Sequence, residues 1–202
     1  IYHGKTYALP DTQSFNIMFV RDDIFERLDL EVPRTWEDFI SATSVLQRNN
    51  MNSYLPYLRI TAATTVTTGA GGLSIYPTML LQSGESLYND ELNATNLNSA
   101  GAVSVFKLWT DFYSKYKLNP DINFYQRFRV GNVPLGITTY SQYLTFAVAA
   151  PEIANKWSIE LLPGIEREDG TIDYTSAGAG TGCSIMNSSK NKDAAWEFIK
   201  WW

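Results

Sequence analysis

The sequence predicts an α/β fold in which a small mixed sheet is flanked by helices. Residues 17–20 and 134–137 are continuously apolar, as strands buried on both faces are. Residues 157–162 predict a third strand, which the Pro163-Gly164 pair ends. Residues 99–116, in contrast, carry apolar side chains at helical spacing. Strands separated by amphipathic helices indicate the α/β class.

The first part of the chain predicts an extended segment followed by two helices. Residues 7–21 are expected to be extended, because they contain a Leu-Pro step and an unbroken apolar run. A short helix should follow from Asp22, which we expect to be its N-cap, to residue 28. The second helix should begin at Thr35 and reach about residue 49, because Thr35 and Asp38 nearly match a capping box.

The middle of the chain predicts loops that alternate with regular elements. Residues 53–60 suit a strand, and the glycine-rich residues 69–72 suit a flexible loop. Residues 75–82 predict a helix, and the polar residues 89–98 predict a loop. The helix over 99–116 has the clearest apolar stripe, which consists of Ala102, Val105, Phe106, Trp109, Phe112, Tyr113 and Tyr116.

The last part of the chain predicts short strands and helices joined by turns. Residues 124–130 suit a short helix, and residues 138–143 suit a polar, aromatic turn that leads into an apolar helix. The charged residues 166–170 predict a surface hairpin or turn. A strand over 181–186 should precede a final helix capped by Asn191, whose expected buried face comprises Ala195, Phe198, Ile199 and Trp202.

Composition excludes several classes of function. The chain has 202 residues, which suits one or two domains, and a net charge of −5. That charge argues against binding to nucleic acid and to anionic membranes. The single cysteine, Cys183, excludes an internal disulfide and a cysteine-based zinc site, and the single histidine, His3, excludes a histidine-rich metal site. We therefore expect neither a metal nor a cofactor.

Several motifs, taken in order, are similar to those of one protein family. They read GKTYALP from Gly4, MFVRDDIF from Met18, VPRTWEDF from Val32, APEI from Ala150 followed by Trp157, and SKNKDAAWEFIKWW from Ser189. In this order they resemble the extracellular solute-binding proteins of ABC importers, more narrowly the carbohydrate-binding, maltose-binding-protein-like family 1. The resemblance covers nearly the whole chain.

The resemblance implies a type II periplasmic-binding-protein fold, in which two lobes are joined by a hinge. Residues 1–21 would be a hinge-crossing segment and residues 22–163 one lobe. Residues 164–202 would return to the other lobe and supply its first strand and helix. Because the chain begins in mid-pattern at Ile1 and stops inside a predicted helix, we expect it to be a piece of a longer precursor that lacks most of the other lobe.

The resemblance also implies a function without catalysis. The protein would bind an extracellular solute, most simply an oligosaccharide, by hinge closure, and deliver it to the ABC permease subunits in the membrane. It would be a monomer outside the cell, lipid-anchored at the bacterial surface or periplasmic. If one wall of the cleft is largely missing, these residues alone should bind the solute poorly.

The turn after residues 134–137 carries the first candidate site. Tyr140, Gln142 and Tyr143 combine aromatic faces with polar groups, and a sugar needs both, because one of its faces consists of C–H groups while its hydroxyls need hydrogen-bonding partners. In the resembling family this stretch places an aromatic residue on the cleft wall. The tryptophan of maltose-binding protein has no counterpart here, which leaves the kind of sugar open. The same spacing also fits tyrosines that face a core.

Four more residues are candidates through the resemblance. Tyr76 follows the glycine-rich loop, where the family often sets a second aromatic platform, although core packing fits equally well. Ser14, Phe15 and Asn16 lie in the presumed hinge crossing, where polar groups on the cleft floor contact ligand. The same groups would also serve to satisfy neighbouring backbone.

Three other patterns favour structure over chemistry. Residues 178–182 are glycine-rich but lack the Lys-Ser/Thr of a phosphate-binding loop, so we interpret them as a flexible turn before a strand. Glu166, Glu168 and Asp169 lie in a charged turn, which suits a solvated surface better than a catalytic pair. Ser188 and Ser189 have no nearby histidine to activate them.

Two other functions stay open at this stage. A glycoside-processing enzyme domain would need two carboxylates facing each other across a pocket, about 5 to 10 Å apart. A ligand-sensing domain of a receptor could have the same sequence as an importer's binding protein.

Overall fold

The computed structural model describes residues 6–56, 58–60, 66–68, 75–89 and 91–202. By contacts the chain divides into two compact units. The first consists of Ile1–Ser14 and Gly178–Trp202, and the second of Phe15–Ala177. Each unit is described by itself below. The roles that the resemblance assigns to residues 1–21, 22–163 and 164–202 stay predictions.

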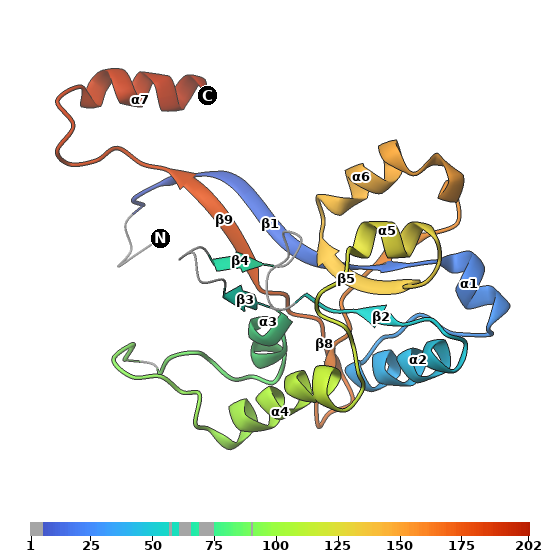
Figure 1. Cartoon of the computed structure of the whole chain (residues 1–202). Coiled ribbons are helices and arrows are strands. Elements are labelled where there is room, and N and C mark those ends of the chain that lie inside the picture. The colour runs from blue at the N-terminus through green and yellow to red at the C-terminus, as the bar shows by residue number, and fades with distance from the viewer. Residues whose placement is uncertain (1–5, 57, 61–65, 69–74, 90) are drawn as a thin grey trace. The chain divides into compact units, whose positions relative to one another are not determined.

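A small mixed sheet forms the centre of the second unit, as predicted (Figure 1). Its strands are β2 (Ser53–Tyr54), β5 (Leu135–Thr139), β1 (Leu9–Val20) and β6 (Ser158–Glu160), hydrogen-bonded in that order. β2 runs parallel to β5, whereas β5 and β6 are both antiparallel to β1. The long β1 begins in the first unit and ends in the second.

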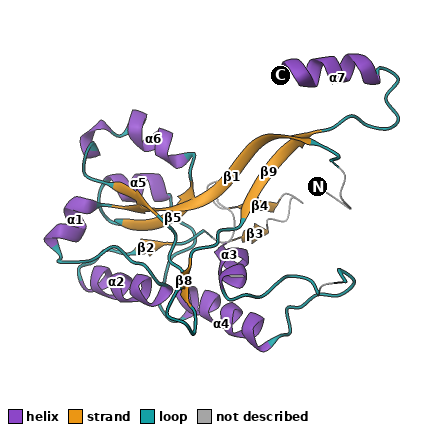
Figure 2. Cartoon of the chain, turned by 180° about the vertical axis from the view of Figure 1, so that it is seen from behind, coloured by secondary structure: helices purple, strands orange, loops and turns teal. Residues whose placement is uncertain are grey.

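Helices cover both faces of this sheet (Figure 2). Met18 lies opposite Ile137, and Val20 lies opposite Leu135. These residues share one face with α2 (Trp36–Arg48), α3 (Ile75–Gln82) and α4 (Ala100–Ser114). Phe19 points to the other face, which packs against α5 (Phe124–Arg129) and α6 (Gln142–Ala149). Because successive side chains alternate, one apolar strand serves two layers of helices.

The second face is organised around a glycine. Gly136 lies between Phe19 on β1 and Tyr54 on β2 in the register of the sheet. A Cβ atom at Gly136 would lie 2.2 Å from the Phe124 ring. Phe124 fills that space and stacks on Tyr54, with ring centroids 5.1 Å apart. The missing side chain therefore lets α5 approach β5 closely.

The start of α2 confirms the predicted capping box. Thr35 accepts a hydrogen bond from the Asp38 N–H, and the Asp38 carboxylate accepts one from the Thr35 N–H. One residue on, the buried Trp36 indole donates to the Gln82 side chain over 2.8 Å. Gln82 in turn donates to the Pro163 carbonyl over 3.0 Å. This buried network ties α2, α3 and the end of the segment after β6 together.

The expected N-cap of the first helix is wrong. α1 (Asp22–Arg27) contains Asp22 as its first residue, and the cap position belongs to Arg21, whose side chain makes no capping bond. The guanidinium instead donates to the carbonyl oxygens of Phe128 and Arg129 at the end of α5 and pairs with Asp23. Arg21 thus donates hydrogen bonds to two carbonyl oxygens at the end of α5.

The expected strand over residues 53–60 divides into two. β2 ends at Tyr54, and β3 (Leu58–Ile60) pairs instead with β4 (Val66–Thr68). The predicted loop at residues 69–72 falls outside the described residues. The predicted hairpin is confirmed: β7 (Ile165–Glu166) pairs with β8 (Ile172–Asp173) around the turn. A short 3-10 helix, η2 (Pro151–Ile153), follows α6.

In the first unit, the glycine-rich segment is a strand and not the expected turn. β9 (Gly178–Cys183) pairs with β1, so the expected strand over 181–186 begins earlier and ends earlier. A Cβ atom at Gly180 would lie 2.6 Å from the Thr12 carbonyl oxygen, so the close approach of the strands requires glycine there. The hydroxyls of Thr12 and Thr181 lie 2.6 Å apart and are hydrogen-bonded across the pair.

The last helix also differs from expectation. α7 (Lys192–Trp201) follows Asn191 as predicted, but Asn191 makes no capping side-chain bond. No residue of α7 is buried, so the expected buried face is not covered in the described structure. Phe198 and Trp201 are 58% and 76% exposed. Among the described residues no helix is long and apolar enough to cross a membrane.

Candidate functional site

Tyr140 lies where the buried strand β5 meets the surface. Every residue of β5 is buried, whereas Tyr140, the next residue, is 44% exposed. Its backbone N–H donates to the Phe15 carbonyl over 3.0 Å, which extends the pairing between β5 and β1 by one more bond. The sheet therefore fixes the position of the Tyr140 backbone, and the side chain projects from its end.

Three further aromatic rings continue from Tyr140. The Phe15 ring lies 5.3 Å from it with planes 24° apart, and the Tyr143 ring lies 5.9 Å from it with planes 5° apart. Trp157 then meets Tyr143 edge to face at 5.7 Å. We call Phe15, Tyr140, Tyr143 and Trp157 the aromatic path. All four belong to the second unit, and each ring of the path contacts the next one.

Polar groups accompany the aromatic path. Asn16, which is 2% exposed, lies opposite Thr139 in the sheet. The Thr139 and Ser141 hydroxyls are hydrogen-bonded over 3.0 Å. The side-chain nitrogen of Gln142 is enclosed and has no hydrogen-bond partner among the described residues. Aromatic faces and neutral polar groups thus lie together at the end of β5.

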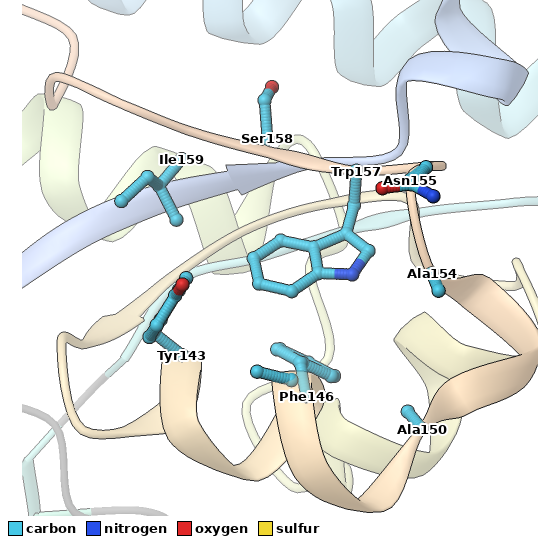
Figure 3. Close-up of a pocket in the computed structure, with 9 residues that line it drawn as sticks. Tyr143, Phe146, Ala150, Ala154, Asn155, Trp157, Ser158 and Ile159 are labelled. Atoms are coloured by element: carbon cyan, nitrogen blue, oxygen red, sulfur yellow. The ribbon is translucent and has the colours of Figure 1, made fainter.

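A pocket of about 500 Å³ opens beside Tyr143 (Figure 3). α6 and residues on either side of η2 line one part of it, and Trp157 with the start of β6 lines the other. Its lining residues are Tyr143, Phe146, Ala147, Ala150, Ala154, Asn155, Trp157, Ser158 and Ile159. None of them carries a charge, so the pocket suits a neutral ligand group.

The family is decided by a match along the whole chain. Residues 1–202 match the family model described as bacterial extracellular solute-binding protein. The chain belongs to this family. The resemblance in the sequence is thereby confirmed, and membership agrees with the expected absence of catalysis, because the family consists of solute-binding proteins. No curated protein matches the chain.

Solved structures of solute-binding proteins share the fold. A Thermotoga lettingae ABC-transporter solute-binding protein bound with α-D-tagatose is 22% identical, with a TM-score of 0.72 over 100% of this chain and 50% of its own. The sugar-binding protein MalE of Xanthomonas citri is 20% identical, with a TM-score of 0.73 over 100% of this chain and 49% of its own.

A third structure gives the same result. The GacH receptor of Streptomyces glaucescens, solved unliganded and with acarbose, is 18% identical, with a TM-score of 0.70 over 100% of this chain and 49% of its own. This solute-binding protein chain therefore spans about half the length of the structures it matches. The predicted α/β lobe of the periplasmic-binding-protein kind is confirmed by these matches.

The remaining predicted site residues lie elsewhere in the solute-binding chain. Tyr76, half-buried on α3, packs against Phe106 and Trp109 of α4 at 5.8 and 5.6 Å. Burial, and then the nearby charge of Glu85, raises the pKa of Tyr76. Tyr76 makes no ring contact with the aromatic path within the described residues, and its role as a platform stays a prediction. Ser14 belongs to the first unit, and its role likewise stays a prediction.

The sequence placed Trp157 at the start of a strand and in a family motif, but not among the candidate site residues. Its ring contacts Tyr143 and also packs against Phe19 and Phe146, with centroids 5.9 and 5.5 Å away. An aromatic residue directly after the polar Asn155-Lys156 step was a local signal that could have marked it as a candidate. Nothing local in the sequence placed it beside Tyr143.

The acidic residues of the β7–β8 hairpin serve the hairpin itself. Asp169 accepts hydrogen bonds from both the backbone and the hydroxyl of Thr171. Asp173 pairs with Arg167 across the turn. Glu166 and Glu168 are exposed. Among the described residues no cluster of histidine, cysteine and acidic side chains could hold a metal ion.

Proposed function

We propose that this solute-binding protein binds a carbohydrate on the aromatic path, with Tyr140 as the main stacking residue. The main support is that Tyr140 is 44% exposed at the end of a buried strand. Its ring also lies nearly parallel to the rings of its neighbours Phe15 and Tyr143, which hold it in place. An exposed ring that cannot easily reorient is a suitable surface for the C–H face of a sugar.

The polar groups of the same segment complement that surface. Ser141 and Gln142 follow Tyr140 directly and carry a neutral hydroxyl and a neutral amide. Sugar hydroxyls require such neutral donors and acceptors. The absence of charged side chains around the neighbouring pocket favours a neutral solute over a phosphate or an amino acid. The tagatose and acarbose bound by two of the similar structures support the same class of ligand.

The steps after binding concern the whole protein. We propose that the two lobes close on an oligosaccharide about a hinge and that the closed form delivers it to the permease subunits of an ABC importer. The protein would act outside the cell, lipid-anchored or periplasmic. Binding energy would drive closure only if both lobes gain contacts with the sugar. Ser14 and Tyr76 would then contribute from the cleft floor and wall.

A panel of solutes tests the proposal. The full-length protein is mixed with mono- and oligosaccharides, amino acids and short peptides, and its melting temperature is measured. We expect at least one saccharide to raise the melting temperature, because a ligand that binds only the folded state stabilises it. Binding of amino acids or peptides without any saccharide would overturn the proposal. Calorimetric titration then gives the affinity.

A further inference from the structure

The pocket beside Tyr143 is the feature that the proposed stacking on Tyr140 leaves unexplained. Figure 3 shows the Trp157 indole between Tyr143 on one side and Ala154 on the other, with Phe146 beneath it. The volume of about 500 Å³ lies within the usual range for ligand pockets. It is therefore large enough for a glycosyl ring and its waters.

Several polar groups of the pocket have no hydrogen-bond partner within the described residues. The Trp157 indole N–H, the Asn155 amide and the Tyr143 hydroxyl make no hydrogen bond to any residue that the structure describes. The Ser158 hydroxyl, in contrast, already donates to Asp22 over 2.7 Å. Three neutral polar groups around an aromatic ring are typical of a site for a polyhydroxy ligand and not of a purely apolar one.

The backbone holds one of these groups in place. Asn155 adopts a left-handed conformation, with φ of 59°, in the turn between η2 and β6. Asparagine tolerates this region better than most residues. The turn thus sets the Asn155 amide at the pocket beside Trp157, as Figure 3 shows.

Tyr143 connects the pocket with the exposed end of the aromatic path. Its ring is parallel to that of Tyr140 and meets Trp157 edge to face. A chain of sugar rings that starts on Tyr140 can therefore continue over Tyr143 without leaving an aromatic surface. A ligand of one ring would leave the pocket unused.

We propose that this pocket is a second carbohydrate subsite, which receives a further glycosyl ring of an oligosaccharide whose first ring lies on Tyr140. The inference rests on the proposed function and adds which residues receive the second ring of the oligosaccharide. Trp157 provides the apolar contact, and Asn155 and the Trp157 N–H provide hydrogen bonds to hydroxyls. Affinity then increases with the length of the saccharide.

The test fills the pocket and leaves the Tyr140 surface open. Ala147 and Ala149 are both exposed on α6, but only Ala147 lines the pocket. Ala147→Trp therefore blocks the subsite, and Ala149→Trp is its matched control. Ala154→Trp, which blocks the pocket from the other wall, is the second variant if Ala147→Trp does not fold. Each full-length protein is titrated by calorimetry with the mono-, di- and trisaccharide of one sugar.

The wild type and Ala149→Trp should bind the longer saccharides about tenfold more tightly than the monosaccharide, which corresponds to one additional aromatic contact. Ala147→Trp should bind all lengths about equally, at the monosaccharide affinity. Unchanged length dependence in Ala147→Trp and Ala154→Trp would overturn the subsite. If Tyr140→Ala still weakened binding in that case, the proposed function would stand. Failure of every saccharide to bind the wild type would overturn both.

Discussion

Tyr140 donates its backbone N–H to the Phe15 carbonyl over 3.0 Å, and the two rings lie 5.3 Å apart. One pair of residues thus joins the end of β5 to the middle of β1 through both the main chain and the side chains. An aromatic surface that is held in this way loses little conformational freedom when a ligand binds.

Tyr140→Ala should weaken saccharide binding to the full-length protein by about 1 to 3 kcal/mol, because it removes the exposed stacking surface. Tyr140→Phe, which retains the ring, should bind nearly as well. Tyr88→Ala is the control, because Tyr88 is a similarly exposed tyrosine, 52% against 44%, outside the aromatic path. Calorimetric titration measures the affinities. A large loss of folding stability with unchanged affinity would mean that Tyr140 is a packing residue.

Gln82→Leu should lower the free energy of unfolding by about 2 to 4 kcal/mol. The substitution leaves the buried Trp36 N–H and the Pro163 carbonyl without partners, and each orphaned group costs about 1 to 3 kcal/mol. Gln126→Leu, on the exposed side of α5, should change the stability by less than about 0.5 kcal/mol. Urea denaturation of both variants gives the comparison. Equal urea midpoints for the two variants would show that the Trp36–Gln82–Pro163 network contributes little to stability.

Gly136→Ala should destabilise the second unit by about 3 kcal/mol or more. The new Cβ would lie 2.2 Å from the Phe124 ring, which would have to leave its place against Tyr54. Gly84→Ala is the control: its φ is 78° and nothing lies within 4 Å, so only the backbone cost of about 1 to 2 kcal/mol applies. Thermal or urea denaturation should therefore show that Gly136→Ala is much less stable than Gly84→Ala. The reverse order would show that α5 can move away at little cost.

Asp173 should make the folding stability of the protein depend on pH in the acidic range. Hydrogen bonds from Thr175, and then the interaction with Arg167, lower the pKa of Asp173 from 3.8 to about 2. A carboxyl whose pKa is lower in the folded state contributes stability above its unfolded value, and this is lost as the pH falls towards its folded value. Asp173→Asn should therefore be less stable than the wild type at neutral pH.

The difference between Asp173→Asn and the wild type should shrink as the pH falls from about 3.8 to about 2. Urea denaturation across this range measures the change. Glu168→Gln, which alters an exposed carboxylate of the same turn, is the control and should follow the wild type at every pH. A constant difference for Asp173→Asn would mean that the hydrogen bonds of Asp173 do not depend on its charge.

Local signals let the sequence predict most helices and strands. The capping box of Thr35 and Asp38 was predictable because both partners lie within one turn of α2. The bounds of α3 followed from the composition of residues 75–82. The error at Asp22 arose because Arg21 is drawn to the end of α5, a helix far away in the chain. The glycine-rich β9 was missed because its partner, β1, lies at the other end of the sequence.

The sequence by itself determined the family, the α/β class and the candidate residues Tyr140, Gln142 and Tyr143, because these depend on residue types at short spacing. Only the tertiary structure decided that Phe15 and Trp157 join Tyr140 and Tyr143, and that Tyr76 packs against α4 instead. Strand pairing brings Phe15 to Tyr140 across most of the chain, and no local pattern records such a contact. The arrangement of the candidate site therefore depends on strand pairing, whereas its residue types can be recognised in the sequence of the turn.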